Sequence, residues 1–160
     1  MPPRLNYAEL APNGLAAMRA VEHYLNTGTL LDPVLLELVR LRASLLNGCE
    51  FCIEMHTHEL NRHNETSGRI AAVATWRESD AYTERERAAF AWTEVITNIQ
   101  DGHASDEDFA AAQEHFSDVD LVNLTLAIAQ INAWNRLAIT FRSEKRKLPH
   151  ADGAESVATQ

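Results

Sequence analysis

Residues 33–60, PVLLELVRLRASLLNGCEFCIEMHTHEL, contain the two consecutive helices from which the fold is inferred. Asp32 is a suitable N-cap in front of the first helix, and Gly48 is a typical residue for its end. Residues 33–46 are apolar on nearly every side, which predicts a buried helix. A second helix is expected from about residue 49 to residue 63.

The rest of the chain is also predicted to be helical, because six glycines and five prolines leave few breaks and no segment alternates apolar and polar residues. We expect an all-α fold, a single domain of about six to seven helices over residues 1–148, followed by a disordered polar tail, 149–160. The further helices expected are about 14–26, about 68–75, one opened by the capping box of Thr83 and Glu86, one from Ser105 to about His115, and a long one after Ser117.

Charge and hydropathy exclude several classes of function. The formal net charge of −9 argues against non-specific nucleic-acid binding and against docking on anionic lipid. No apolar run reaches 18 residues, so no transmembrane helix is expected. The N-terminus lacks the continuous apolar segment of a secretory signal, so we expect a cytoplasmic location, where a Cys-x-x-Cys pair is more often catalytic or metal-binding than structural.

Both cysteines of the chain, Cys49 and Cys52, lie at the start of the second helix. Residues three apart share a helix face, so the two thiols are neighbours and could close a disulfide. The positive end of the helix dipole favours a thiolate there. His56, four residues after Cys52, lies on the same face and could act on a thiol as a base or as an ion-pair partner.

The same residues allow two other interpretations. His58 lies on the opposite side of the helix, so it cannot join Cys49, Cys52 and His56 around one tetrahedral ion. A site of those three residues with an outside ligand stays open. The cysteines could also be two inert buried thiols.

Glu37 lies on the apolar stripe of the buried helix, where a carboxylate needs a partner. One candidate is Arg40, three residues later, in a pair on the helix surface. The other is the Cys52 and His56 site on the next helix. Sequence alone leaves both partners open.

These four residues form the pattern E-x11-C-x2-C-x3-H, from Glu37 through Cys49 and Cys52 to His56. The pattern and its flanks resemble the signature of the alkyl hydroperoxidase D-like (AhpD-like) proteins, within the carboxymuconolactone decarboxylase family. INAWNRLAI, residues 131–139, is similar to the C-terminal helix of small single-domain members of that family.

The resemblance implies an all-helical fold that assembles into trimers or hexamers, and a thiol-dependent reduction of small hydroperoxides without metal, haem or flavin. It implies that Cys52 attacks the peroxide, that Cys49 resolves the sulfenic acid as a disulfide, and that Glu37 and His56 form a proton relay to Cys52. An outside dithiol, in some relatives a dihydrolipoyl-bearing protein, would then reduce the disulfide.

This sequence departs from the best-known members at Phe51, where they carry a histidine between the cysteines. The family also includes lactone decarboxylases, which generally lack the cysteine pair. Two alternatives to the peroxidase are therefore kept: a metal-binding or redox-sensing module that uses Cys49, Cys52 and His56, and a decarboxylase-like enzyme whose activity survives loss of both thiols.

Two expectations concern the last helix. Its apolar stretch Leu124–Trp134 offers more apolar surface than one small core needs, which predicts a homo-oligomer. Trp134, Asn135 and Arg136 could line a pocket or an interface, or could serve helix packing alone.

Overall fold

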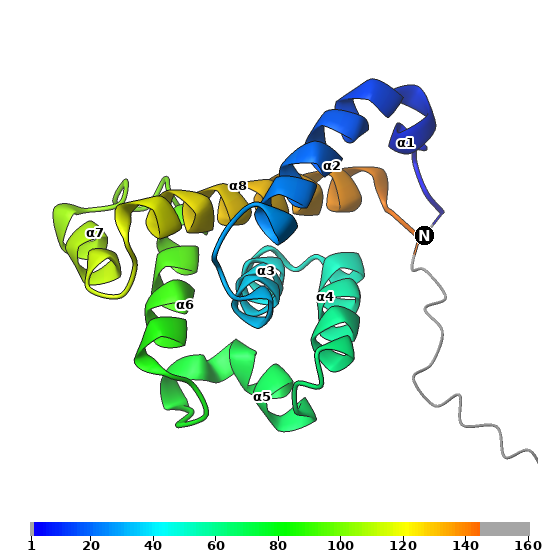
Figure 1. Cartoon of the computed structure of the whole chain (residues 1–160). Coiled ribbons are helices and arrows are strands. Elements are labelled where there is room, and N and C mark those ends of the chain that lie inside the picture. Colours follow the sequence, from blue (N-terminus) through cyan, green and yellow to red (C-terminus); the bar gives the residue numbers. More distant parts are fainter. Residues whose placement is uncertain (1, 145–160) are drawn as a thin grey trace, which may run out of the picture.

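A computed structural model describes residues 2–144, and every regular element in that range is helical (Figure 1). The predicted all-α fold is confirmed. The expected tail, 149–160, lies outside the described residues. The elements are α1 (Tyr7–Leu10), α2 (Pro12–Thr27), α3 (Pro33–Asn47), α4 (Glu50–Arg62), α5 (Ser67–Ala72), the 3-10 helix η1 (Val73–Glu78), α6 (Glu84–Thr97), α7 (Asp106–Gln113) and α8 (Asp118–Phe141).

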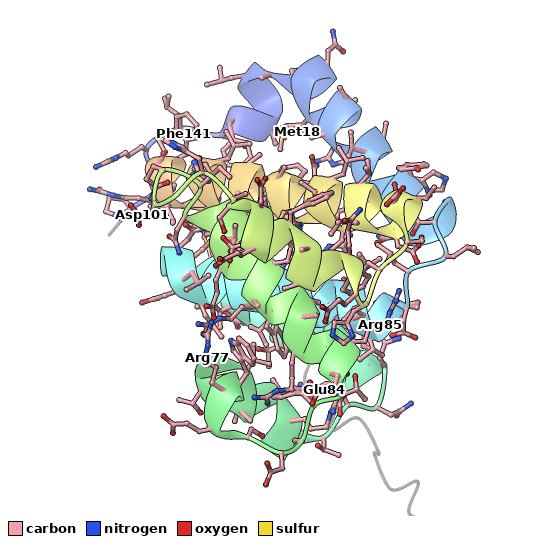
Figure 2. All side chains as sticks on the ribbon, turned by 90° about the vertical axis from the view of Figure 1, so that its left-hand side faces the viewer. Met18, Arg77, Glu84, Arg85, Asp101 and Phe141 are labelled. Atoms are coloured by element: carbon pink, nitrogen blue, oxygen red, sulfur yellow. The ribbon has the colours of Figure 1, made fainter. Side chains whose placement is uncertain are left out.

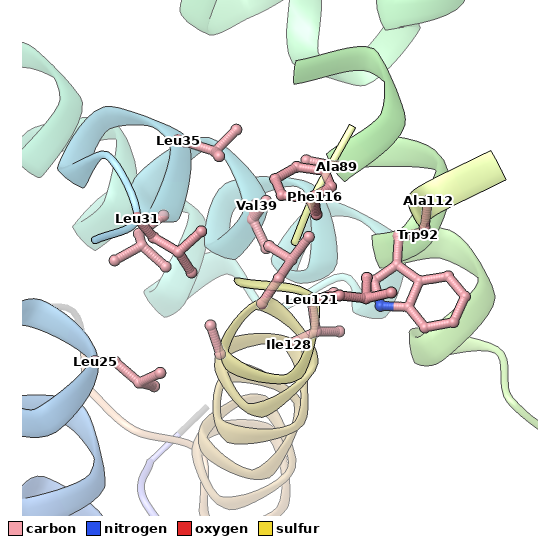
Figure 3. Packing of buried hydrophobic residues seen from close by; sticks show 13 residues of the cluster. Leu25, Leu31, Leu35, Val39, Ala89, Trp92, Ala112, Phe116, Leu121 and Ile128 are labelled. Atoms are coloured by element: carbon pink, nitrogen blue, oxygen red, sulfur yellow. The ribbon is translucent and has the colours of Figure 1, made fainter. Parts of the chain in front are cut away.

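Helix α3 occupies the centre of the domain, with α2, α4, α6 and α8 around it (Figure 1). Its side chains are buried on several sides, as its apolar sequence predicts. One core cluster joins α3 to α6 and α8 through residues such as Val39, Trp92 and Leu121 (Figure 3). Because α3 is held in the core, the residues that precede the α3–α4 turn have fixed positions.

Several predicted helix starts are confirmed by the capping contacts. The Asp32 carboxylate accepts a hydrogen bond from the backbone N–H of Leu35 at 3.0 Å, and Pro33 occupies the first turn. Capping boxes form at Thr83 with Glu86 and at Ser105 with Asp108. These contacts satisfy backbone donors that the first turn of a helix leaves unpaired.

The N-terminal part differs from the prediction. The first long helix begins at Pro12 and is preceded by α1, a four-residue helix capped by the Asn6 side chain, which accepts from the N–H of Ala8. One turn is too short to show a helical period in the sequence. The helix expected at about 68–75 is divided into α5 and η1, and the backbone leaves helical geometry at Thr75.

The N-terminal segment packs against the end of α8 (Figure 1). The backbone N–H of Arg4 donates to the carbonyl of Phe141 at 3.0 Å. The Tyr7 hydroxyl and the Ser143 hydroxyl are hydrogen-bonded at 3.1 Å, and the Tyr7 ring lies 5.5 Å from that of Phe141. These contacts hold α1 beside the C-terminal end of α8.

The predicted apolar stretch Leu124–Trp134 is partly buried within the chain, where Leu124, Ile128 and Ile131 are core residues. Leu126 of the same stretch is exposed, as are Val119, Val122 and Ile139 elsewhere on α8. None of the helices within residues 2–144 is long and apolar enough to cross a membrane.

A polar cluster around Glu94 joins α3, η1 and α6 at the end of the molecule opposite to Met18 of α2 (Figure 2 labels its member Arg77). Glu94 Oε1 accepts from Trp76 Nε1 at 2.7 Å and from Arg42 Nη2 at 2.8 Å, and Glu94 Oε2 pairs with Arg77 Nη2 at 2.7 Å. Burial acts to raise the Glu94 pKa, but hydrogen bonds from Arg77 and Trp76 and the charge of Arg42 hold it below its ordinary value.

Candidate active site

The turn between α3 and α4 places both thiols. Gly48 has φ of 66°, in the left-handed region that glycine adopts without strain, and its N–H donates to carbonyls of the last turn of α3. The chain then reverses, so that Cys49 becomes the N-cap of α4. Cys52 follows in the first turn, and both cysteines are buried free thiols.

The two sulfurs are not equivalent. The Cys52 thiol donates a hydrogen bond to the Cys49 sulfur, and this outweighs burial and lowers the Cys49 pKa to about 7. The same hydrogen bond, together with burial and the charge on Cys49, raises the Cys52 pKa above its ordinary value. When one thiol of the pair is ionised, these shifts favour the negative charge on Cys49.

An open cavity of about 710 Å³ leads to this pair. Cys52 and His56 are among the lining residues, whereas Cys49 is not. Much of the wall is apolar and comes from the N-terminal segment, α2, α4 and the end of α8, through residues that include Leu5, Tyr7, Leu15, Phe51, Met55, Trp134 and Phe141. A ligand in the cavity would reach Cys52 before Cys49.

His56 connects the cavity to Glu37. Its Nδ1 lies 2.7 Å from Glu37 Oε2, and both side chains are buried. Because an ionised carboxylate only accepts hydrogen bonds, Nδ1 carries a proton in this pair, and neutral His56 has its lone pair on Nε2. Nε2 is buried without a hydrogen-bond partner, the one such side-chain nitrogen or oxygen found within residues 2–144. Such an atom, on a residue that lines a cavity, is available to a reactant.

Glu37 has both of the partners that the sequence left open. Its Oε1 accepts from Arg40 Nη1 at 2.5 Å while its Oε2 pairs with His56. Arg40 is only 3% exposed, so this is not the surface pair that was one of the expectations. Burial acts to raise the Glu37 pKa, but the hydrogen bond and charge of His56 and the charge of Arg40 hold it below its ordinary value.

A second carboxylate, Glu22 of α2, extends this chain of charges to the cavity wall. Glu22 Oε1 pairs with Arg40 Nη2 at 3.2 Å, and Glu22 Oε2 accepts from Trp134 Nε1 at 2.9 Å. Both Glu22 and Trp134 line the cavity. Sequence reasoning assigned no role to Glu22, because nothing in the local pattern shows that α2 packs beside Arg40.

Trp134, Asn135 and Arg136 of α8, whose roles the sequence left open, have different surroundings. Trp134 lines the cavity. Asn135 is fully buried, and its side chain acts to lower the pKa of both cysteines. Arg136 is exposed and donates to the backbone carbonyl of Asn132 at 2.9 Å.

No metal site is formed by the predicted ligands. Within residues 2–144, no group of three or more His, Cys, Asp or Glu side chains is arranged to hold an ion. His56 already shares Nδ1 with Glu37, and His58 is half-buried and is not among the residues that line the cavity. This geometry does not favour the interpretation as a module that binds metal through Cys49, Cys52 and His56.

The profile of the carboxymuconolactone decarboxylase family matches residues 12–95, a range that includes both cysteines, Glu37 and His56. The chain belongs to this family. It is 38% identical over 139 residues to YdfG, an uncharacterised protein of Bacillus subtilis (strain 168). The aligned part covers 87% of this chain and 94% of YdfG.

Solved structures place it among the AhpD-like members of the carboxymuconolactone decarboxylase family. One is a protein of unknown function from Agrobacterium tumefaciens, for which the role of the antioxidant defence protein AhpD has been suggested. It is 39% identical, with a TM-score of 0.87, over 91% of this chain and 99% of that chain. The debrominase Bmp8 bound to 2,3,4-tribromopyrrole has a TM-score of 0.74 at 19% identity, over 87% of this chain and 74% of Bmp8, which shows a shared fold alone.

Proposed function

We propose that this protein is a thiol-dependent peroxidase that reduces a small organic hydroperoxide through Cys52 and Cys49. The observation that carries the proposal is the cavity wall where Cys52 lies beside His56, whose unpartnered Nε2 is supported from behind by Glu37. A nucleophile, a base and a residue that orients the base are the parts of an activated thiol.

In the first step the Cys52 sulfur attacks the outer oxygen of the hydroperoxide. An S–O bond forms, the O–O bond breaks, and Cys52 becomes the sulfenic acid while the alkoxide leaves. His56 Nε2 takes the thiol proton of Cys52 and returns it to the alkoxide, which leaves as the alcohol. Glu37 holds the imidazole by its Nδ1–H during this transfer.

In the second step the Cys49 sulfur attacks the sulfenic sulfur of Cys52. The S–S bond forms, the S–O bond breaks, and the oxygen leaves as hydroxide, which takes a proton from solvent to become water. An outside dithiol, of the dihydrolipoyl type or a protein dithiol, then reduces the disulfide by exchange and is itself oxidised. The low pKa of Cys49, about 7, makes it a suitable resolving thiolate at neutral pH.

Phe51 suits an organic rather than a purely polar substrate. It lines the cavity together with Met55 and Trp134, so an apolar ring stands where the best-known relatives carry a histidine. The apolar wall can accept the carbon skeleton of an alkyl hydroperoxide while the peroxide group reaches Cys52.

We also propose that the chain works as a homo-oligomer, a trimer or a hexamer. Support comes from the apolar side chains that α8 exposes, Val122 and Leu126 among them, beside an apolar groove of about 410 Å³ that Trp92 and Phe109 help to line. Light scattering at micromolar concentration should give a mass of at least three chains, and a monomer would contradict the proposal.

The test is peroxide consumption with a dithiol donor, comparing the wild type with Cys52→Ser. We expect turnover in the wild type and none in the variant. Consumption of tert-butyl hydroperoxide that is unchanged in Cys52→Ser would contradict the peroxidase. Activity on a lactone that survives replacement of both cysteines would instead establish the decarboxylase-like alternative.

A further inference from the structure

Helix α8 presents one polar side chain to the thiol pair. Ile131 and Ala138 pack against Cys49 and Cys52 in one buried cluster. Asn135 lies four residues after Ile131 and three before Ala138, so it shares their face of the helix and lies between them. It is fully buried, with no exposed surface. An amide in this position needs a hydrogen-bond partner for each of its polar atoms.

The orientation of a side-chain amide is normally assigned from its partners, because its oxygen and nitrogen are nearly indistinguishable. Here the assignment starts from Asn132, which has two unambiguous neighbours. Its Nδ2 donates to the backbone carbonyl of Ile128 at 2.9 Å, and a carbonyl can only accept. Its Oδ1 accepts from Arg136 Nη1 at 3.1 Å, and a guanidinium can only donate. The Asn132 amide therefore has one possible orientation.

Asn47 links the orientation of the Asn132 amide to that of the Asn135 amide. The Asn132 Oδ1 requires a donor, so Asn47 turns its Nδ2 toward it at 2.9 Å. The second hydrogen of the same Nδ2 goes to Asn135 Oδ1 at 2.8 Å. The Asn135 Oδ1 is thereby engaged on the side away from the thiols, and its Nδ2 has to face the other way. There it donates to Ser44 Oγ at 3.1 Å and has one more hydrogen to give.

We propose that Asn135 is a positioning residue of the thiol site, whose NH₂ group is held toward the sulfurs of Cys49 and Cys52 and donates to whichever sulfur carries the negative charge. In the proposed cycle Cys49 carries the negative charge at rest, and Cys52 becomes negative when His56 takes its proton, so a donor fixed near the pair serves both states. The proposal rests on the proposed function only in that it takes the two cysteines as the reacting groups.

The electrostatics of the pair agree with this geometry. A hydrogen bond from the Asn135 side chain acts to lower the pKa of each cysteine, although it is not the largest influence on either. The other groups that face the sulfurs do not compete with it. They are Ala43 of α3 and Ile131 and Ala138 of α8, with Phe51 and Trp134 packed beside them. Of the titratable side chains of α4, His56 lines the same cavity as Cys52, and Glu50, next to Cys49, is exposed.

The test is the pH dependence of iodoacetamide alkylation of the fully reduced protein, with the modified cysteine identified by peptide mass. Asn135→Leu keeps the approximate volume and removes the donor. We expect its alkylation midpoint to rise by about one pH unit or more, with the rate at neutral pH about tenfold lower. A merely structural amide would lower the melting temperature and leave the midpoint where it is.

Two further variants keep the result interpretable. Asn123→Leu removes another buried amide of α8, one that accepts from the Tyr24 hydroxyl far along the helix from the thiols, and its midpoint should equal that of the wild type. Asn47→Ala leaves Asn135 in place but releases its Oδ1, so its midpoint should rise by less than that of Asn135→Leu. If Asn135→Leu does not fold, Asn47→Ala decides the question.

A midpoint unchanged in Asn135→Leu, or in Asn47→Ala where that variant decides, would overturn the proposal. An equal rise in Asn123→Leu would overturn it as well, because the shift would then follow from loss of any buried amide. Alkylation requires no peroxide. A wild type that consumes no hydroperoxide but shows the expected order of midpoints would therefore reject the proposed function and retain the role of Asn135.

Discussion

Two carboxylates of this protein, Glu94 and Glu37, are held by arginines inside the helical domain, and their surroundings differ in one respect. Glu94 accepts hydrogen bonds from Arg42, Arg77 and Trp76, all of which are permanent donors. Glu37 accepts from Arg40 on one oxygen, but on the other it meets His56. Both carboxylates have a pKa below the ordinary value.

This difference distinguishes a buried ion pair that takes part in proton transfer from one that only stabilises the fold. The cluster of Glu94 ends in groups that cannot change protonation near neutral pH, so it can only hold α3, η1 and α6 together. The cluster of Glu37 ends in an imidazole whose Nε2 is unpartnered and whose side chain lines the cavity beside Cys52. We therefore infer that the first cluster is structural and that the second handles protons.

The largest effect is expected at the thiols that the Glu37 cluster serves. Cys49→Ser should form one sulfenic acid per chain at Cys52 and then stall, because the resolving sulfur is missing. Trapping with a sulfenic-acid reagent, followed by peptide mass, identifies the site. A stable sulfenic acid at Cys49 in the Cys52→Ser protein would reverse the two roles. This outcome has to be measured because the negative charge of the pair is favoured on Cys49.

Glu37→Gln should lower peroxide turnover by about 10²–10⁴-fold, the usual contribution of acid–base assistance. Loss of the carboxylate's charge weakens the support of His56 as proton acceptor, so the thiolate should also appear at higher pH. The checks are turnover and the pH profile of thiol alkylation, each against wild type. If both profiles superimpose, Glu37 is a structural residue like Glu94.

Glu94→Gln is the matched control and should behave in the opposite way. Turnover should stay at the wild-type level, while the free energy of unfolding at neutral pH should fall by about 1–3 kcal/mol, since three donors lose a charged acceptor. A carboxyl with a lowered pKa contributes stability above its unfolded value, ordinarily 4.5, and loses it as pH falls through the folded value.

The deficit of Glu94→Gln in denaturant unfolding should therefore be constant near neutral pH and shrink when the pH falls below about 4.5. A deficit that grows on acidification would contradict the assigned direction of the pKa shift. A loss of turnover at neutral pH would show that the Glu94 cluster, too, serves the site.

The smallest effects are expected at the two tryptophans that donate to these clusters. Trp76→Phe removes one donor from Glu94, which is only 17% exposed, and should cost about 1 kcal/mol of unfolding free energy without changing turnover. Trp134→Phe removes the donor to Glu22, which is 30% exposed, and should lower turnover by less than about tenfold with little change in melting temperature. If the two variants lose stability and turnover to the same extent, the distinction between the Glu94 cluster and the Glu37 cluster is contradicted.

Local features of the site followed from sequence because they depend on helix geometry alone. Cys49, Cys52 and His56 share one face of α4 through their spacing, and Asp32 and Gly48 define the ends of α3 through capping chemistry that acts within one turn. The family pattern that includes Glu37 joins two consecutive helices. All of these relations span few residues, so the sequence pattern is sufficient to predict them.

The remaining partners were decided by tertiary packing. Trp134 meets Glu22 across 112 positions, and Asn135 meets Asn47 across 88, distances over which no periodicity carries information. Arg40 looked like a surface partner of Glu37, and only the packing of α2 beside α3 shows that it is buried between Glu37 and Glu22. The sequence by itself determined most of the helices and the order of reactive groups on α4. The arrangement of the helices determined which charges are buried, which His56 nitrogen lacks a partner, and which amide faces the sulfurs, because burial depends on contacts between helices.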